Sequence, residues 1–370
     1  MWNQTYEIGS SFHLLNKKIL EIENSSEPIN IQDSENLKFL SSGRQAICAC
    51  LTDITKTVNT NKTALVPAYT CQSVLGGFLE KGYHLSFYSV DQKFQVRTST
   101  LNNLIKNKTP DVLLFHPYFG FDTIIQDQLL DKQSTIVIYD ATQSWASGFE
   151  YPFADYKIVS LRKWAALPDG AIAEKINGKF CLLSIEPEQE DLTKDTLQVY
   201  DLKEKYLSYQ KGEKSEMLQG FANLKQTFFD NQYTLHSMTN FSRKMLELFT
   251  AKSTLKEWQL QRRVNYQTLY NYANWDKIGT PYFELATGVI PLYFPLNVKN
   301  MTRQDFQEYL ATNNVYCPVV WPIPQNVEIT PVSDELAKIR KNCLCIPIDQ
   351  RYSKKDMEYI LELIDKLKIY

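Results

Sequence analysis

The 370-residue sequence has no long apolar run and no marked excess of either charge. No segment approaches the roughly 20 apolar residues that span a bilayer. The N-terminus also lacks the basic stretch and apolar core of a secretory signal, so we expect a protein of the cytoplasm. The net charge of −2 gives no reason to expect nucleic acid or an anionic membrane as the main partner.

The sequence also lacks the short motifs of several common chemistries. It has no G-x-G-x-x-G after a predicted strand and no G-x-S-x-G, and the Gly-Glu-Lys-Ser segment at 212–215 has the wrong spacing for a phosphate-binding P-loop. Its four histidines lie far apart, without H-E-x-x-H or C-x-x-C. We therefore predict no metal site.

The seven cysteines are odd in number and scattered over the chain. This pattern favours reduced thiols over a disulfide framework. Two C-x-C pairs, Cys48/Cys50 and Cys343/Cys345, each lie in an apolar run. We interpret them as buried small hydrophobic residues.

Apolar segments of strand and helix type alternate from residue 64 onward, and 44% of the residues are hydrophobic and 22% charged, as in ordinary globular proteins. The predicted strands are 64–66, 85–90, 112–116, 135–139 and 170–173, and the predicted helices between them are 74–80, 101–107 and 124–130. Such alternation indicates right-handed crossovers and a mostly parallel sheet covered on both faces. The expected class is α/β, a three-layer sandwich.

The length suits a large α/β domain with a smaller partner. We predict an N-terminal segment over 1–38, a large cofactor-binding domain over 39–250 and a small α+β domain over 251–370. Residues 186–256 show no clear strands and are interpreted as helices, some of them packing on a second subunit. The small domain is predicted to contain helices at 255–272, 303–310 and 356–367 and strands at 289–294 and 315–320.

Two β-branched runs within the large domain, 136–139 and 157–159, each end in polar residues. Asp140 follows the first run, and Ser160 and Lys163 follow the second. Since neighbouring parallel strands deliver such residues to one end of the sheet, where open α/β sheets bind ligands, we expect these side chains to meet there.

A lysine, a carboxylate and a phosphate donor are the groups that a pyridoxal phosphate (PLP) site requires. Lys163 would hold the aldehyde as a Schiff base, and Arg162 is a candidate for a cation that lowers the pKa of its amine. Asp140 would keep the pyridine nitrogen protonated, and Ser160 would bind the phosphate.

A helix is predicted to begin at Ser42 and Gly43, since apolar residues follow at helical spacing. The free backbone N–H groups at its start suit an anion. Taken alone, the segment has a commoner alternative, which is a plain serine N-cap without a ligand.

The ordered motifs of the chain resemble those of the DegT/StrS-type sugar aminotransferases, which are fold type I PLP enzymes. The motifs are residues 42–46 (Ser-Gly-Arg-Gln-Ala), 66–70 (Val-Pro-Ala-Tyr-Thr), Asp91, 116–120 (His-Pro-Tyr-Phe-Gly), 140–143 (Asp-Ala-Thr-Gln), and 160–163 followed by Asp169-Gly170. The resemblance covers residues 40–175 well and the tail more weakly.

The resemblance implies a role for each matching residue. Lys163 would bind the cofactor and move the proton between Cα and C4′, Asp140 would pair with the pyridine nitrogen, and Gln143 would hydrogen-bond near the ring hydroxyl. Ser160 and the amides of Gly43 and Arg44 would hold the phosphate. His116 is either a cofactor neighbour or a structural histidine at a strand end.

The resemblance further implies a homodimer with shared active sites. The expected reaction moves an amino group from glutamate or glutamine to a keto group, usually on a nucleotide-linked sugar. A dehydratase is disfavoured, because family dehydratases carry histidine in place of the lysine and this chain has Lys163. Arg351 in the tail is expected to be structural.

The chain departs from the family pattern at three points, and the first two, the serine spacing and Cys71, leave a non-catalytic regulatory or scaffold protein as the alternative. Ser160 stands three residues before Lys163, where the family commonly has five. Cys71 replaces the aromatic residue that stacks on the cofactor ring in many members, and Gly170-Ala171 replaces a Gly-Gly pair.

Overall fold

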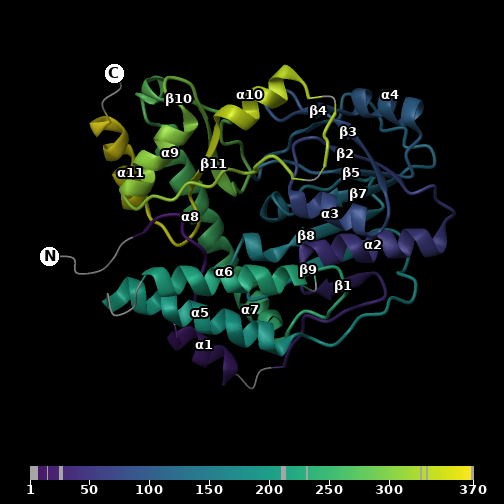
Figure 1. Cartoon of the computed structure of the whole chain (residues 1–370), viewed down its shortest axis with the longest axis horizontal. Helices are drawn as coiled ribbons and strands as arrows, with labels where there is room; N and C mark the ends of the chain where they lie inside the picture. The colour runs from purple at the N-terminus through teal and green to yellow at the C-terminus, as the bar shows by residue number, and fades with distance from the viewer. Residues whose placement is uncertain are drawn as a thin grey trace.

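A seven-stranded sheet is built from strands between residues 37 and 175 in the computed structural model (Figure 1). The structure describes residues 7–14, 16–24, 28–209, 214–230, 232–325, 327–330 and 332–367. The strand order is β1-β9-β8-β7-β5-β2-β3. The strands are β1 (Leu37–Leu40), β2 (Thr63–Pro67), β3 (His84–Tyr88), β5 (Val112–Phe115), β7 (Ile136–Asp140), β8 (Tyr156–Ser160) and β9 (Ala171–Lys175). The strands from β8 to β3 pair in parallel, and β9 pairs antiparallel with both β8 and β1.

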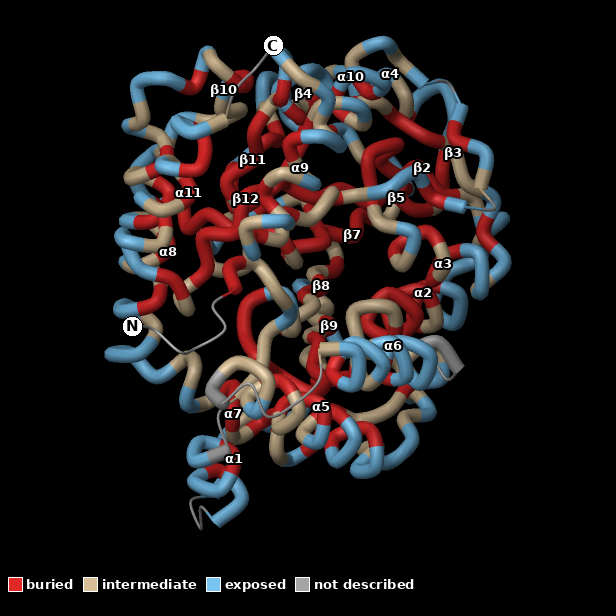
Figure 2. Tube along the Cα trace, turned by 60° about the vertical axis from the view of Figure 1, so that its left-hand side comes forward, coloured by how far each residue is buried: buried red, intermediate tan, exposed pale blue. Residues whose placement is uncertain are grey.

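Helices cover both faces of this sheet. Helices α2 (Gly43–Thr57) and α3 (Gln72–Glu80) share a hydrophobic cluster with Ile138, and α4 (Thr98–Lys108) shares a second cluster with Val137 and Tyr139. Because successive side chains of a strand point to opposite faces, β7 contributes to both layers. Figure 2 shows the buried trace concentrated along these strands. The predicted three-layer α/β sandwich is confirmed.

A helical hairpin follows the sheet in the chain. Helices α5 (Glu190–Tyr209) and α6 (Lys214–Asp230) lie side by side in Figure 1 and pack through Leu192, Val199 and Leu224. Helix α7 (Asn240–Thr250) comes next, and α1 (Asn16–Glu23) lies below α5 in Figure 1. The helical prediction for this region is confirmed, whereas its packing on a second subunit stays a prediction.

The C-terminal part of the chain has a sheet of its own. Strands β10 (Gly279–Pro281), β11 (Tyr293–Val298) and β12 (Cys343–Pro347) form it, and all of its pairings are antiparallel. The helices around it are α8 (Lys252–Tyr270), α9 (Arg303–Thr312), α10 (Asp334–Asn342) and α11 (Lys354–Lys366). Apolar residues around the seven-stranded sheet and around this C-terminal sheet join in one core cluster, and the division of the chain into domains stays a prediction. Within the described ranges, every helix is too short or too polar to cross a membrane.

Two predicted elements are wrong. Instead of a helix over 124–130, Ile124–Ile125 forms a short strand, β6, that pairs with β4 (Val96–Arg97). Asp127 then accepts hydrogen bonds from the amide and hydroxyl of Ser99 and so caps α4, which requires a loop. The predicted strand at 315–320 is reduced to one bridge between Val315 and Ile8. A proline at 318 has no N–H to donate to a ladder.

A buried ion pair ties β9 to α2. The Asp53 side chain is fully buried and accepts hydrogen bonds from Lys175 Nζ at 2.7 Å, the Tyr156 hydroxyl at 2.5 Å and the Cys181 amide at 2.5 Å. These bonds outweigh the desolvation by burial and hold the pKa of the carboxyl below its usual value. The pair therefore stabilises the fold at neutral pH.

Replacing Lys175 with methionine is expected to lower the free energy of unfolding by about 1.5–3 kcal/mol, because the Asp53 carboxylate loses a charge-assisted hydrogen bond. Urea denaturation measures this loss. Lys179→Met is the matched control, since Lys179 pairs with Glu35 where both side chains are about two-thirds exposed or more. A loss of at most about 0.5 kcal/mol is expected there. Equal losses in the two variants contradict the prediction.

Candidate active site

A cavity of about 410 Å³ lies at the carboxyl ends of the parallel strands. His116 follows β5, Asp140 ends β7 and Ser160 ends β8. The structure brings all seven predicted site residues to the lining of this cavity, namely Gly43, Arg44, His116, Asp140, Gln143, Ser160 and Lys163. The placement agrees with the general position of ligand sites in open α/β sheets.

Lys163 lies in a short 3₁₀ turn, η2 (Leu161–Lys163), directly after β8. Its side chain is exposed to the cavity, and in the described part of the chain its amine has no hydrogen bond or ion pair. The enclosing protein displaces bulk water and so lowers the pKa of the amine; Cys71 opposes this shift, while the charges of Arg162 and Arg44 add to it. Such an amine is a better nucleophile than a surface lysine.

Asp140 is 6% exposed at the end of β7. One carboxylate oxygen accepts a hydrogen bond of 2.9 Å from the amide of Thr142. Burial outweighs this bond and raises the pKa of the carboxyl. Among the described residues, no cationic side chain forms an ion pair with Asp140. A buried carboxylate of this kind is suited to a cationic ring nitrogen supplied by a ligand.

Thr142 holds the strand ends together, a role that the sequence analysis missed. Its hydroxyl accepts a hydrogen bond of 3.0 Å from the Ser160 amide, and its carbonyl accepts one of 2.8 Å from the indole of Trp164. Thr142 thus links β7, β8 and the turn that carries Lys163. The sequence shows Thr142 as a polar residue two positions after Asp140, but it does not show that Thr142 bonds to Ser160 and Trp164.

Gln143 fixes the loop after β5. Its side-chain oxygen accepts a hydrogen bond of 2.8 Å from the Phe119 amide. Phe119 and Gly120 both have positive φ, and a Cβ on Gly120 would lie 2.3 Å from the Ile290 carbonyl oxygen. The turn therefore requires glycine at 120.

The start of α2 abuts Ser160. A Cβ added to Gly43 would lie 3.0 Å from the Cβ of Ser160, so a larger residue at this helix terminus would crowd the strand end. Ser42 is the N-cap, and its hydroxyl accepts a hydrogen bond from the Gln45 amide. The cap is therefore present, and the first amides of α2 lie beside the Ser160 hydroxyl, an arrangement suited to a phosphate.

His116 is a neutral ring in the cavity wall. Burial lowers its pKa to about 3. Its Nε2 lies 3.0 Å from the Thr70 hydroxyl oxygen, while its Nδ1 is buried without a partner among the described residues. The ring contacts Tyr118 and Trp321, with centroid distances of 4.6 and 5.4 Å. Trp321 also lines the cavity, although the sequence analysis did not select it.

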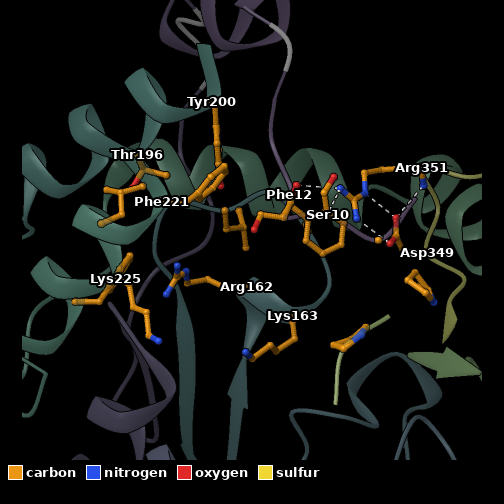
Figure 3. A pocket seen from close by; sticks show the side chains of 18 of the residues that line it. Ser10, Phe12, Arg162, Lys163, Thr196, Tyr200, Phe221, Lys225, Asp349 and Arg351 are labelled. Atoms are coloured by element: carbon orange, nitrogen blue, oxygen red, sulfur yellow. Dashed lines mark hydrogen bonds and ion pairs between the residues drawn. The ribbon is translucent and has the colours of Figure 1, made fainter. Parts of the chain in front are cut away.

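A second cavity of about 520 Å³ adjoins the first (Figure 3). The residues lining both are Arg44, Ser73, Arg162, Lys163, Tyr293 and Pro318. Segments distant in sequence form its other walls, with Ser10 and Phe12 from the N-terminal segment, Tyr200 from α5 and Phe221 from α6. Lys163 therefore lies where the two cavities meet.

Arg351 lines the second cavity but is engaged by protein groups. It forms two hydrogen bonds to the Asp349 carboxylate, of 2.7 and 2.9 Å, and donates to the carbonyls of Ser10 and Ser11. Its guanidinium also lies 4.2 Å from the Phe12 ring centroid. These contacts are those of the structural residue that the sequence analysis expected.

No cluster of three or more His, Cys, Asp or Glu side chains suited to a metal ion occurs in the ranges that the structure describes. All seven cysteines are free. The two C-x-C pairs are buried, as predicted. Cys71 is a helix cap at the cavity edge, where its sulfur accepts a hydrogen bond from the Ser73 amide.

Solved structures similar to this chain include several aminotransferases. Helicobacter pylori PseC, an aminotransferase involved in the biosynthesis of pseudoaminic acid, matches with a TM-score of 0.67 and 13% identity, over 98% of this chain and 99% of that one. The PLP-form of Spr1654 from Streptococcus pneumoniae matches with a TM-score of 0.63 and 12% identity, over 98% of this chain and 100% of that one. A DegT DnrJ EryC1 StrS aminotransferase from Brucella abortus matches with a TM-score of 0.58 and 14% identity, over 96% of this chain and 91% of that one.

No protein-family model and no curated protein sequence matches the chain. At 12–14% identity the structural matches show the fold, which is that of the fold type I PLP-dependent aminotransferases. The fold class implied by the sequence motifs is confirmed. The roles of individual side chains depend on the chemistry of the site itself.

Proposed function

We propose that the protein is a PLP-dependent aminotransferase that transfers an amino group from an amino acid to a keto sugar. The observation that carries the proposal is the pairing of Lys163 and Asp140 in one cavity. The amine and the carboxylate both lack a counter-ion among the described residues, and PLP offers a partner to each, through its aldehyde and its ring nitrogen.

The bound cofactor would supply the electron sink for the carbanion formed at the substrate Cα. The protein side chains would do the rest. Lys163 would hold the aldehyde carbon and then carry a proton between Cα and C4′. Asp140 would keep the ring nitrogen protonated, and Gln143 would bind near the ring hydroxyl. Ser160 and the first amides of α2 would hold the phosphate.

We propose His116 as a cofactor neighbour, because it lines the same cavity with one ring nitrogen unpaired among the described residues. Its low pKa keeps the ring neutral, so it would contact the cofactor by packing and hydrogen bonding rather than by charge.

The finer identity of the reaction is also proposed. The donor would be glutamate and the acceptor a nucleotide-linked sugar, with the protein acting as a homodimer in the cytoplasm. PseC, which resembles this chain in fold, is described as acting in the biosynthesis of pseudoaminic acid, and this supports a sugar acceptor. The absence of disulfides among the seven cysteines supports a reducing compartment.

The absorption spectrum of the purified protein with added PLP tests the proposal. A yellow band that bleaches when glutamate is added, and returns when an excess of 2-oxoglutarate is added, is expected, since the first half-reaction moves the amino group onto the cofactor reversibly. A protein that takes up no PLP contradicts the proposal and supports the scaffold alternative. If the protein takes up PLP but no amino acid bleaches the yellow band, the cofactor assignment stands and the aminotransferase activity is contradicted.

A further inference from the structure

Arg162 is a guanidinium enclosed by protein without a counter-charge. It precedes Lys163 in η2, lines both cavities and points into the second one (Figure 3). In the part of the chain that the structure describes, none of its nitrogens forms a hydrogen bond or ion pair, and its Nε is buried. Asp169 is the carboxylate that acts on it electrostatically, but it forms no ion pair with Arg162 and instead accepts hydrogen bonds from Thr239.

Helix α6 positions this guanidinium. The Phe228 ring lies 3.8 Å from Arg162 Cζ and so covers one face of the planar group. The same helix is held to the start of α2, because Arg44 donates hydrogen bonds to the Phe228 carbonyl and to the Gln232 side chain. A stacked guanidinium keeps its edge N–H groups available for a bidentate oxyanion.

The cavity around Arg162 has an excess of positive charge. Besides Lys163, its lining has four cationic side chains and one carboxylate, namely Arg44, Arg162, Lys225, Arg351 and Asp349. Asp349, the carboxylate of this lining, is already paired with Arg351, which lowers the pKa of the carboxyl. Among the described residues Arg162 itself has no paired anion, and enclosing a cation without an anion is unfavourable unless a ligand compensates it.

We propose that Arg162 binds an oxyanion of the substrate, a phosphate or a carboxylate, against the Phe228 ring of α6. The inference rests on the proposed function and deepens it, because it assigns a specificity residue one position before the lysine that does the chemistry. The acceptor's phosphate and the donor's second carboxylate share this chemistry. The cavity of about 520 Å³ has room for either molecule beside Lys163.

The test is a calorimetric titration of the PLP-loaded protein with inorganic pyrophosphate and, separately, with glutarate. At least one of the two anions is expected to bind, and Arg162→Gln is expected to weaken that binding about 10- to 100-fold, the usual worth of hydrogen bonds to a charged group. Arg162→Lys is expected to retain part of the affinity, since it keeps the charge but loses the bidentate geometry. Pyrophosphate binding alone assigns the site to the acceptor, and glutarate binding alone assigns it to the donor.

The control is Arg97→Gln, which removes the same charge from a side chain that is 59% exposed and lines neither cavity. It is expected to leave both titrations unchanged. The proposal is overturned if neither anion binds the wild type, or if Arg162→Gln binds as the wild type does. It is also overturned if Arg162→Gln loses affinity for PLP instead, because the arginine would then hold the cofactor's phosphate.

Failure of the underlying function gives a different result. A protein that takes up no PLP stays colourless, which contradicts the proposed activity without involving Arg162. The same titrations on the protein as purified still report whether Arg162 binds an oxyanion. Melting temperatures of both Arg162 variants verify that they are folded.

Discussion

Lys163→Ala protein is expected to keep no yellow band once added PLP that is not bound has been removed by gel filtration. It is also expected to lose amino-group transfer by about 10²–10⁴-fold, the usual effect of removing a positioned proton-transfer group. Lys163 lies where the two cavities meet, and its amine has no protein partner among the described residues. Its pKa is lowered mainly by loss of bulk water, so the neutral, nucleophilic form is available at lower pH than for an ordinary lysine.

The measurement compares absorption spectra and transfer rates of Lys163→Ala, Lys157→Ala and the wild type. Lys157 is the matched control, because it lies in the strand that leads to the same turn but lines neither cavity. We expect it to behave as the wild type. A yellow band that persists in Lys163→Ala places the cofactor on another amine and contradicts the assignment.

The sequence allowed the centre of the site to be predicted because its groups lie at the ends of short, strongly apolar strands. Asp140 ends β7, Ser160 ends β8 and Lys163 follows within one turn. Parallel pairing of β7 and β8 then places these ends together without any further information. The apolar pattern of the two strands and their parallel pairing were therefore sufficient to predict that Asp140, Ser160 and Lys163 lie together.

The second cavity could not be predicted in the same way. Its walls come from the N-terminal segment, α5, α6 and the C-terminal sheet, as with Phe12, Tyr200 and Tyr293. Their proximity depends on how these elements pack, and the hydrophobic periodicity of the sequence does not predict that packing. The contact between Arg162 and Phe228 is of this kind, since 66 residues separate the two side chains in the sequence (228 − 162).

The wrong helix at 124–130 shows a limit of apolar pattern. Ile124 is buried, but Leu129 is 89% exposed, so the apolar residues do not form one buried face. The missed strand β12 illustrates the opposite case. All five of its residues are buried, and a short continuous apolar run does not distinguish a buried strand from part of a helix.

Asp140→Asn is expected to have opposite effects on the empty and the PLP-loaded protein. In the empty protein, burial raises the pKa of Asp140, so the folded state holds its proton more tightly than the unfolded state does. Stability is then lost as pH rises from the unfolded carboxyl's value of about 3.9 toward the raised folded value. The amide side chain of the variant carries no charge, so this loss disappears, and at neutral pH we expect the variant without PLP to be more stable by about 1–3 kcal/mol.

Asp53→Asn is the matched comparison, because Asp53 is also buried, at 0% exposed against 6% for Asp140, but is paired with Lys175. Its folded pKa is lowered, so its contribution to stability is present above the unfolded value of about 3.9 and is lost as pH falls through the folded value. Asp53→Asn should therefore reduce the stability of the empty protein at neutral pH, where Asp140→Asn increases it. Thermal melts of the two variants and the wild type between pH 4 and pH 8, without PLP, measure the direction of each stability change. If both variants are less stable than the wild type, Asp140 is not an unpaired carboxylate in the empty protein.

With PLP bound, Asp140→Asn should be less stable than the wild type, whereas the effect of Asp53→Asn should keep its direction. A protonated ring nitrogen compensates the buried carboxylate, so the wild type gains more stability from the cofactor than Asp140→Asn does. The same pairing favours the protonated ring during the reaction, and its loss is expected to slow amino-group transfer by about 10²–10³-fold, the usual cost of removing one preorganised electrostatic partner. If PLP stabilises the wild type and Asp140→Asn equally, the ring nitrogen does not face Asp140. A buried carboxylate that destabilises the empty protein, yet strengthens binding and catalysis once the cofactor is present, is a property of a functional site and is not expected of a scaffold that has lost its cofactor.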